Sequence, residues 1–160
     1  MGYIQFEDVH KSFGNNEVLK GITMGVEKGH MATLLGPSGC GKSTWLRLVA
    51  GLDEPTAGEI LYKGEPVKGP GRERGMVFQE YSLLPWRTVG QHITDVLPRE
   101  RQDEAARWLE LVELEDEADT SPSALSGGMG RRLALGRCLA LGGSVYLLDE
   151  PFAGVDPERT

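Results

Sequence analysis

The segment Gly36–Thr44 contains the residue types that hold phosphate groups in a compact loop. It fits the pattern G-x-x-x-x-G-K-[ST] at Gly36, Gly41, Lys42 and Ser43. Glycines let successive backbone N–H groups turn inward and form a concave anion site. Lys42 would supply positive charge for the β- and γ-phosphates of a nucleotide, and Ser43 a hydroxyl for Mg²⁺. The alternative is a glycine-rich turn that binds nothing.

Two adjacent carboxylates, Asp149 and Glu150, follow the apolar run Val145–Leu148. Consecutive apolar residues are typical of a strand that is covered on both faces. A carboxylate at the end of such a strand can hold Mg²⁺, and a second one can orient or deprotonate an attacking water. Acidic pairs are common in loops, but together with the upstream loop this pair predicts hydrolysis of a nucleoside triphosphate.

A third segment, Ser126-Gly127-Gly128, is typical of a helix start. The N–H groups of a first helical turn, together with the serine hydroxyl, can form a second anion site. We expect the helix body over residues 131–141, ended by Gly142 and Gly143. The alternative is an ordinary helix start with a flexible glycine pair.

The phosphate loop requires a strand before it and a helix after it. Residues 30–35 are short and apolar and are expected to form that buried strand. Residues 42–50 are expected to form the helix, which ends at Gly51. An amphipathic helix is expected over 101–114, followed by a solvated acidic connection over 113–119. Further strands are expected over residues 3–9, 18–26, 59–62 and 76–78.

The composition is that of one soluble globular domain, with 160 residues, 39% hydrophobic and 26% charged. No apolar run approaches the ~20 residues of a membrane span, and no signal peptide is predicted. A net charge of −7 argues against a general nucleic-acid binder. Cys40 and Cys138 form no disulfide framework and have no metal-type spacing, which favours a reducing cytoplasm. Cys138 is expected to be a small buried residue on a helix.

The three motifs in this order resemble the ATP-binding subunit of ATP-binding-cassette (ABC) transporters, over nearly the whole chain. Leu125–Gly128 resembles the signature of that family, and Gln79 lies where its glutamine loop does. Val155 and Asp156 resemble its D-loop. The stretch 76–89 is similar to importers of the nitrate, sulfonate and taurine type.

The resemblance implies an α/β fold of the P-loop NTPase type. Its central sheet would be mainly parallel, with a small antiparallel β part and a shortened helical subdomain. We expect one ATP-binding domain over residues 1–160. Residues 1–80 and 143–160 would form the core with the β part, and residues 81–142 the helical insertion that includes the signature helix.

The resemblance also implies roles for the matching positions. Phe13 would stack on adenine, although a core aromatic is the alternative, and Val18 would pack near the ribose. The signature residues Ser126, Gly127 and Gly128 would close on the γ-phosphate that a second copy holds. Glu150 would be the general base; the expected catalytic residues are Glu150, Lys42 and Gln79, and the expected metal ligands are Ser43, Gln79 and Asp149. The expected ATP-binding residues are Phe13, Val18, Gly36, Pro37, Ser38, Gly39, Cys40, Gly41, Lys42, Ser43 and Thr44.

The implied function is an ATP-binding and ATP-hydrolysing subunit of an importer, with ATP and Mg²⁺ bound. A homodimer would hold two ATP at its interface and drive solute transport through membrane permease subunits. Those subunits would dock on residues 79–86, where Leu83, Leu84, Pro85 and Trp86 form either an interface or a local core. A periplasmic or extracellular solute-binding protein would take part indirectly, and no nucleic acid is expected. The chain would be cytoplasmic and peripheral on the inner face of the cell membrane.

Three departures from the family pattern qualify this reading. Met129 and Arg131 stand where the family commonly has glutamines, and the segment between Gln79 and Ser126 is short. The switch histidine of the family lies downstream of the D-loop, whereas the histidines here, His10, His30 and His92, all precede the carboxylates. We therefore expect a truncated or shortened chain, or one that hydrolyses ATP poorly. The alternative functions are a non-catalytic nucleotide-binding module and a soluble cassette ATPase in DNA repair or translation.

Overall fold

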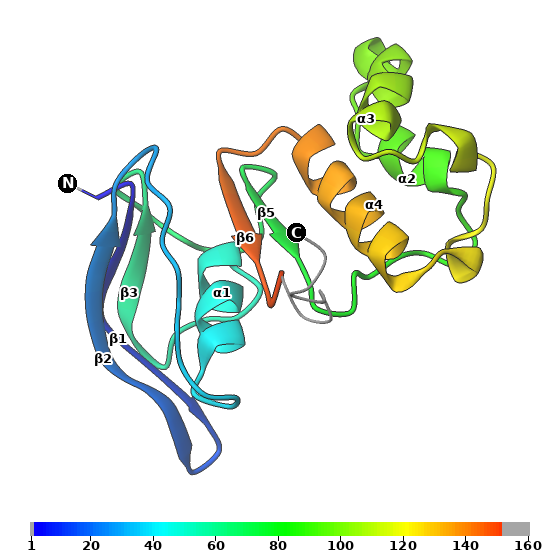
Figure 1. Cartoon of the computed structure of the whole chain (residues 1–160). Coiled ribbons are helices and arrows are strands. Elements are labelled where there is room, and N and C mark those ends of the chain that lie inside the picture. Colours follow the sequence, from blue (N-terminus) through cyan, green and yellow to red (C-terminus); the bar gives the residue numbers. More distant parts are fainter. Residues whose placement is uncertain (1, 152–160) are drawn as a thin grey trace. The chain divides into compact units, whose positions relative to one another are not determined.

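A computed structural model describes residues 2–151 of the chain. The chain divides into two compact units, Met1–Arg74 and Gly75–Thr160 (Figure 1). The first unit holds the phosphate loop. The second holds the acidic pair and the signature.

The first unit is built on a four-stranded antiparallel sheet with the order β2-β1-β3-β4. Phe6 of this sheet is buried and stacks on Trp45 of the helix α1, with ring centroids 4.5 Å apart. Leu48 and Val49 of α1 are buried as well, so one face of the helix closes the core of this unit. The elements are β1 (Ile4–Phe13), β2 (Asn16–Val26), α1 (Lys42–Ala50), β3 (Ala57–Tyr62) and β4 (Glu65–Pro66).

The strand that we expected over residues 30–35 is not formed, so that prediction is wrong. These residues have no regular secondary structure, and Met31 and Leu35 are 93% and 89% exposed. An apolar segment becomes a strand only where a neighbouring strand completes its hydrogen bonds. None of the strands in the described part of the chain pairs with this segment.

The second unit combines a two-stranded sheet, β5-β6, with a group of short helices. Figure 1 shows the two strands running in the same direction. The helices α2, α3 and α4 share one apolar core, in which Val89, Ile93 and Leu133 are fully buried. The elements are β5 (Arg74–Val77), α2 (Val89–Thr94), η1 (Arg99–Glu104), α3 (Ala105–Leu111), η2 (Glu115–Glu117), η3 (Pro122–Ala124), α4 (Gly127–Ala140) and β6 (Val145–Leu148).

The expected helix over residues 101–114 is wrong in its extent. Its first part is the 3₁₀ turn η1, and α3 ends at Leu111. Glu113 has a left-handed φ of 55°, and Val112 and Leu114 turn into the core on either side of it. This change of direction ends the helix.

The expectation that residues 145–148 are covered on both faces is also wrong for the described part of the chain. Only Leu147 of β6 is buried, whereas Tyr146 and Leu148 are 42% and 38% exposed. The two faces of a strand are buried by the layers that pack on them, and the described residues leave Tyr146 and Leu148 partly uncovered.

The other expected elements are confirmed, with boundaries that shift by a few residues. The helix over residues 42–50 has the expected bounds and ends at Gly51, whose φ is 75°. The helix expected over 131–141 begins earlier, at Gly127, and Cys138 is buried on it. The division into a core and an insertion over 81–142 stays a prediction.

Candidate functional site

The phosphate loop is exposed over residues 36–40 and leads directly into α1. Gly41 has a φ of 98°, which favours glycine. A Cβ at this position would lie 2.9 Å from Val18 Cγ1 and 3.0 Å from Leu19 Cδ2. The end of the loop therefore packs closely on Val18 and Leu19 of β2, and the role of Val18 near a ribose stays a prediction.

Lys42 reaches back across its own loop. Its Nζ donates hydrogen bonds to the carbonyl oxygens of Gly36 (2.7 Å) and Pro37 (2.8 Å) and lies 3.8 Å from Cys40 Sγ. The backbone of the loop thus curves around the ammonium group, so the positive charge of Lys42 lies at the loop that is predicted to bind phosphate. Ser43 is exposed in the first turn of α1, and Thr44 is half-buried.

Phe13 ends β1 and is 51% exposed, so the alternative of a core aromatic does not hold. Lys11 Nζ lies 4.9 Å from the centre of the ring and donates a hydrogen bond to Glu54 O at 2.7 Å. The lysine is thereby held near the ring, and such cation–π pairs orient an exposed aromatic side chain.

The carboxyl ends of β5 and β6 lie next to each other in the second unit. The Asp149 N–H donates to Val77 O at 3.0 Å, and Gln79 follows Val77 by two residues. Asp149 is half-buried, whereas Gln79 and Glu150 are exposed, and Glu150 has a φ of 47°. Residues with oxygen donors therefore follow the ends of two neighbouring strands, and such oxygens are of the kind that Mg²⁺ prefers.

The signature opens α4. The Ser126 hydroxyl accepts a hydrogen bond from the Met129 N–H at 3.2 Å and caps the helix. Gly127 and Gly128 are exposed, and a Cβ at either would meet no described atom within 4 Å. Nothing in the described part of the chain therefore requires glycine at these two positions.

Two departures from the family pattern have structural explanations. The Met129 side chain packs against the core of the helical group. The Arg131 guanidinium donates to Tyr81 Oη at 3.0 and 3.2 Å, so it orients a residue of the loop that follows β5.

The loop over residues 78–88 joins β5 to α2 and divides its apolar residues between core and surface. Leu83 packs against the core, whereas Leu84 and Trp86 are 38% and 73% exposed. The local-core alternative thus holds for Leu83 but not for Trp86.

Sequence reasoning missed the residues that hold this loop. Thr88 and Gln91 form a capping box at the start of α2, and the Thr-x-x-Gln spacing could have revealed it. His92 and Arg137 form hydrogen bonds with the backbone of the loop, and no local sequence pattern predicts them. The predicted D-loop residues Val155 and Asp156 lie outside the described residues.

The family model for ABC transporters matches residues 19–153. The chain belongs to the ABC transporter family. This match covers most of the chain and includes the phosphate loop, the signature and the acidic pair.

Relatives of this ABC chain include ATP-binding proteins named for import. A nitrate import ATP-binding protein of Synechocystis sp. is 44% identical over 96% of this chain and 62% of that protein. An aliphatic sulfonates import ATP-binding protein of Bacillus thuringiensis subsp. konkukian is 43% identical over 91% of this chain and 59% of that protein. The chain therefore spans about 60% of the length of these relatives.

A solved structure confirms the fold class. The dimeric post-hydrolysis state of the ATP-binding cassette MJ0796, bound to ADP and Pi, matches with a TM-score of 0.84 and 29% identity. The match covers 97% of this chain and 77% of the other. The P-loop NTPase fold expected from the sequence is thus the fold of this ABC chain.

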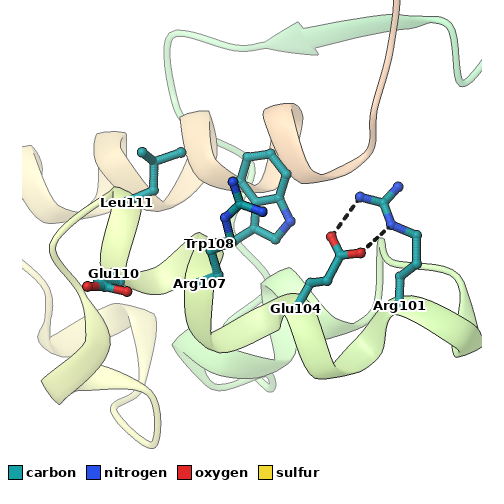
Figure 2. Close-up of a pocket in the computed structure, with 6 residues that line it drawn as sticks. All are labelled: Arg101, Glu104, Arg107, Trp108, Glu110 and Leu111. Carbon is teal, nitrogen blue, oxygen red and sulfur yellow. Dashed lines mark hydrogen bonds and ion pairs between the residues drawn. The ribbon is translucent and has the colours of Figure 1, made fainter.

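The ABC chain also has an open hollow of about 420 Å³ along η1 and α3 (Figure 2). The ion pair between Arg101 and Glu104 (2.7 Å) lies at one end, and the exposed Leu111 at the other. The hydrogen bond from Arg101 lowers the pKa of Glu104. None of the residues that line this hollow belongs to the predicted nucleotide site.

Within the described part of the chain, no three His, Cys, Asp or Glu residues are grouped closely enough to hold a metal ion by themselves. Of the predicted Mg²⁺ ligands Ser43, Gln79 and Asp149, Asp149 alone is of these residue types, so the predicted set is not one that such a grouping would reveal. No helix in the described residues combines the length and the apolar character that a membrane span requires.

Proposed function

We propose that this chain binds and hydrolyses ATP as part of an ABC importer. The observation that carries the proposal is the closed geometry of the phosphate loop, whose carbonyl groups of Gly36 and Pro37 hold the Lys42 ammonium. The names of its relatives, which refer to nitrate and aliphatic sulfonate import, support the import direction.

The loop residues Gly36–Thr44 bind the phosphates of ATP. Backbone N–H groups and the Lys42 ammonium face the phosphate oxygens, while Phe13 stacks on the adenine and Val18 packs near the ribose. The exposed ring of Phe13 and the contact between Val18 and Gly41 support these roles.

The Ser43 hydroxyl, the Asp149 carboxylate and the Gln79 amide oxygen are hard donors that fit Mg²⁺. When bound, the metal ion neutralises charge on the phosphate oxygens. The exposed Glu150 carboxylate accepts a proton from the attacking water, and Lys42 and the backbone N–H groups stabilise the charge of the transferring phosphoryl group.

A second copy of the chain completes the site. Ser126, Gly127 and Gly128 of one copy approach the γ-phosphate bound to the other, so that two ATP molecules lie in a homodimer interface. The absence of any described atom near a Cβ on Gly127 or Gly128 supports this role, because a separate molecule can come close there. The likeness to a dimeric cassette supports it as well.

Membrane permease subunits dock on residues 79–86, which we call the docking loop, and a solute-binding protein acts through them. The exposed Leu84 and Trp86 support this surface. The chain then works on the cytoplasmic face of the cell membrane, without nucleic acid.

Replacing Glu150 by Gln tests the catalytic part of the proposal. ATP turnover should fall by about 100-fold or more, because the general base is lost, while ATP binding persists. The measurement is phosphate release alongside equilibrium ATP binding, with Glu115→Gln as an exposed acidic control. Equal and near-zero turnover in the wild type and Glu150→Gln would leave nucleotide binding as the function, whereas equal turnover at a substantial rate would exclude Glu150 as the base.

A further inference from the structure

The start of the docking loop has a backbone conformation that needs external support. Tyr81 and Ser82 have left-handed φ values of 58° and 47°, which are unfavourable for residues other than glycine. Arg137 of α4 donates hydrogen bonds to both of their carbonyl oxygens, at 3.1 Å and 3.0 Å. The helix α4 therefore holds the first half of the loop.

A buried histidine holds the second half. His92 is 2% exposed, and its Nε2 accepts a hydrogen bond from the Leu84 N–H at 2.8 Å. Its Nδ1 lies 2.8 Å from Thr88 O, and a carbonyl can only accept, so Nδ1 carries the proton. The neutral ring thus joins the Leu84 N–H to the N-cap residue of α2.

Charged groups from three elements face this ring. Arg137 on α4 and Arg87 in the segment before α2 disfavour a positive charge on the His92 ring. Asp95 at the end of α2 favours it. Asp95 also forms an ion pair with Arg87 at 3.0 Å. Burial is the largest influence, and it lowers the pKa of His92 below its usual 6.5.

We propose that His92 is a positioning residue for the docking loop, which it holds through Leu84 when neutral and releases when protonated. A protonated ring has donors on both nitrogens and cannot accept the Leu84 N–H. Release would free the backbone beside Trp86 and change the surface that a membrane subunit meets. The consequence for docking rests on the proposed function, whereas the hydrogen-bonded bridge does not.

Amide hydrogen exchange in the intact chain tests the bridge directly. After correction for intrinsic rates, protection of the Leu84 amide should fall about tenfold when NMR shows the His92 ring protonating, while the Leu133 amide in the core of α4 stays protected. Constant Leu84 protection across that titration would overturn the proposal.

Two variants separate the two nitrogens. Gln places an amide oxygen near the position of Nε2, so His92→Gln should keep Leu84 protected at every pH. Asn reaches only as far as Nδ1, so His92→Asn should leave Leu84 about tenfold less protected even at neutral pH. Equal Leu84 protection in His92→Asn and the wild type would overturn the proposal, because a purely space-filling role would give that result.

Docking is measured in parallel by co-purification with the membrane subunits at neutral and acidic pH. Capture of the wild type should weaken several-fold at acidic pH, and His92→Gln should remove this dependence. His10→Gln, at a histidine in the other unit, is the matched control and should behave like the wild type. Docking that is strong but insensitive to pH and to His92→Asn would refute the inference, whereas no docking at any pH would refute the proposed function.

Discussion

The two glycine-rich helix starts of this chain are built differently. At the start of α1, Gly41 has a φ of 98° and no room for a side chain beside Val18, and no side chain caps the helix. At the start of α4, the Ser126 hydroxyl caps the helix, and a Cβ on Gly127 or Gly128 would meet open space. The fold of the chain itself requires the first glycine. The described part of the chain does not require the second pair, which in the proposed function contacts a second copy.

The largest expected effect is on nucleotide binding at the start of α1. Lys42→Ala should weaken ATP binding by about 100-fold or more, because several charge-assisted hydrogen bonds to phosphate are lost. Isothermal titration calorimetry measures this, with the exposed Lys20→Ala as a control for overall charge. Unchanged affinity in Lys42→Ala would show that ATP does not use this loop.

The difference between the two helix starts can be tested by adding one methyl group to a glycine of each. Gly41→Ala should lower the free energy of unfolding by about 1–3 kcal/mol, because both its φ and its contact with Val18 exclude a Cβ. Gly127→Ala should leave the unfolding free energy unchanged or raise it by less than about 1 kcal/mol. Urea denaturation of both variants measures the difference. Similar losses in both would remove the distinction between the two starts.

The cap of α4 offers a smaller test. Ser126→Ala should cost about 1 kcal/mol of stability, because the Met129 N–H loses its acceptor. Ser126→Asp should restore stability, since a carboxylate also caps, yet it should impair turnover by placing negative charge near the γ-phosphate. Denaturation and phosphate release are measured together. Full activity in Ser126→Asp would argue against a phosphate contact at this end of α4.

The smallest effect concerns His10 in the first unit. His10 Nδ1 lies 2.8 Å from Glu17 Oε1, and this hydrogen bond is the main cause that raises the pKa of His10 above 6.5. The contribution of this pair to the free energy of unfolding is fully present below pH 6.5. It is lost as the pH rises through the raised pKa of His10. The pH dependence of His92 runs the other way, because its pKa is lowered. The stability that the neutral ring contributes is lost as the pH falls from 6.5 through this lowered pKa.

NMR titration of the two rings measures both directions. Glu17→Gln should bring the midpoint of His10 down towards 6.5 and leave that of His92 unchanged. A wild-type His10 midpoint at or below 6.5 would contradict the geometry of this pair.

Helix ends and motifs that depend on neighbouring residues could be predicted from the sequence, and so could several strands, whereas the contacts between distant side chains could not. The helix over residues 42–50 was correct because Gly41, Gly51 and the apolar spacing act locally. The strand over 30–35 was wrong because its formation depends on a partner strand. The phosphate loop and the signature were recognisable as motifs, whereas the contacts of His92 with Leu84 and of Arg137 with Tyr81 join segments that no local pattern connects.

The central claim is that the two helix starts act on the same ATP from different copies of the chain. It can be tested by mixing Lys42→Ala with Gly128→Glu and measuring phosphate release. Glu at position 128 lies in open space in the first turn of α4, where negative charge suits the helix, so this variant should fold.

Each variant alone should be nearly inactive, since every composite site then carries one defect. An equal mixture should recover up to about a quarter of the wild-type rate, because about half of the dimers are mixed and each of these joins one intact loop to one intact signature. A mixture that stays as inactive as its components, while size-exclusion chromatography shows that mixed dimers form, would contradict the account.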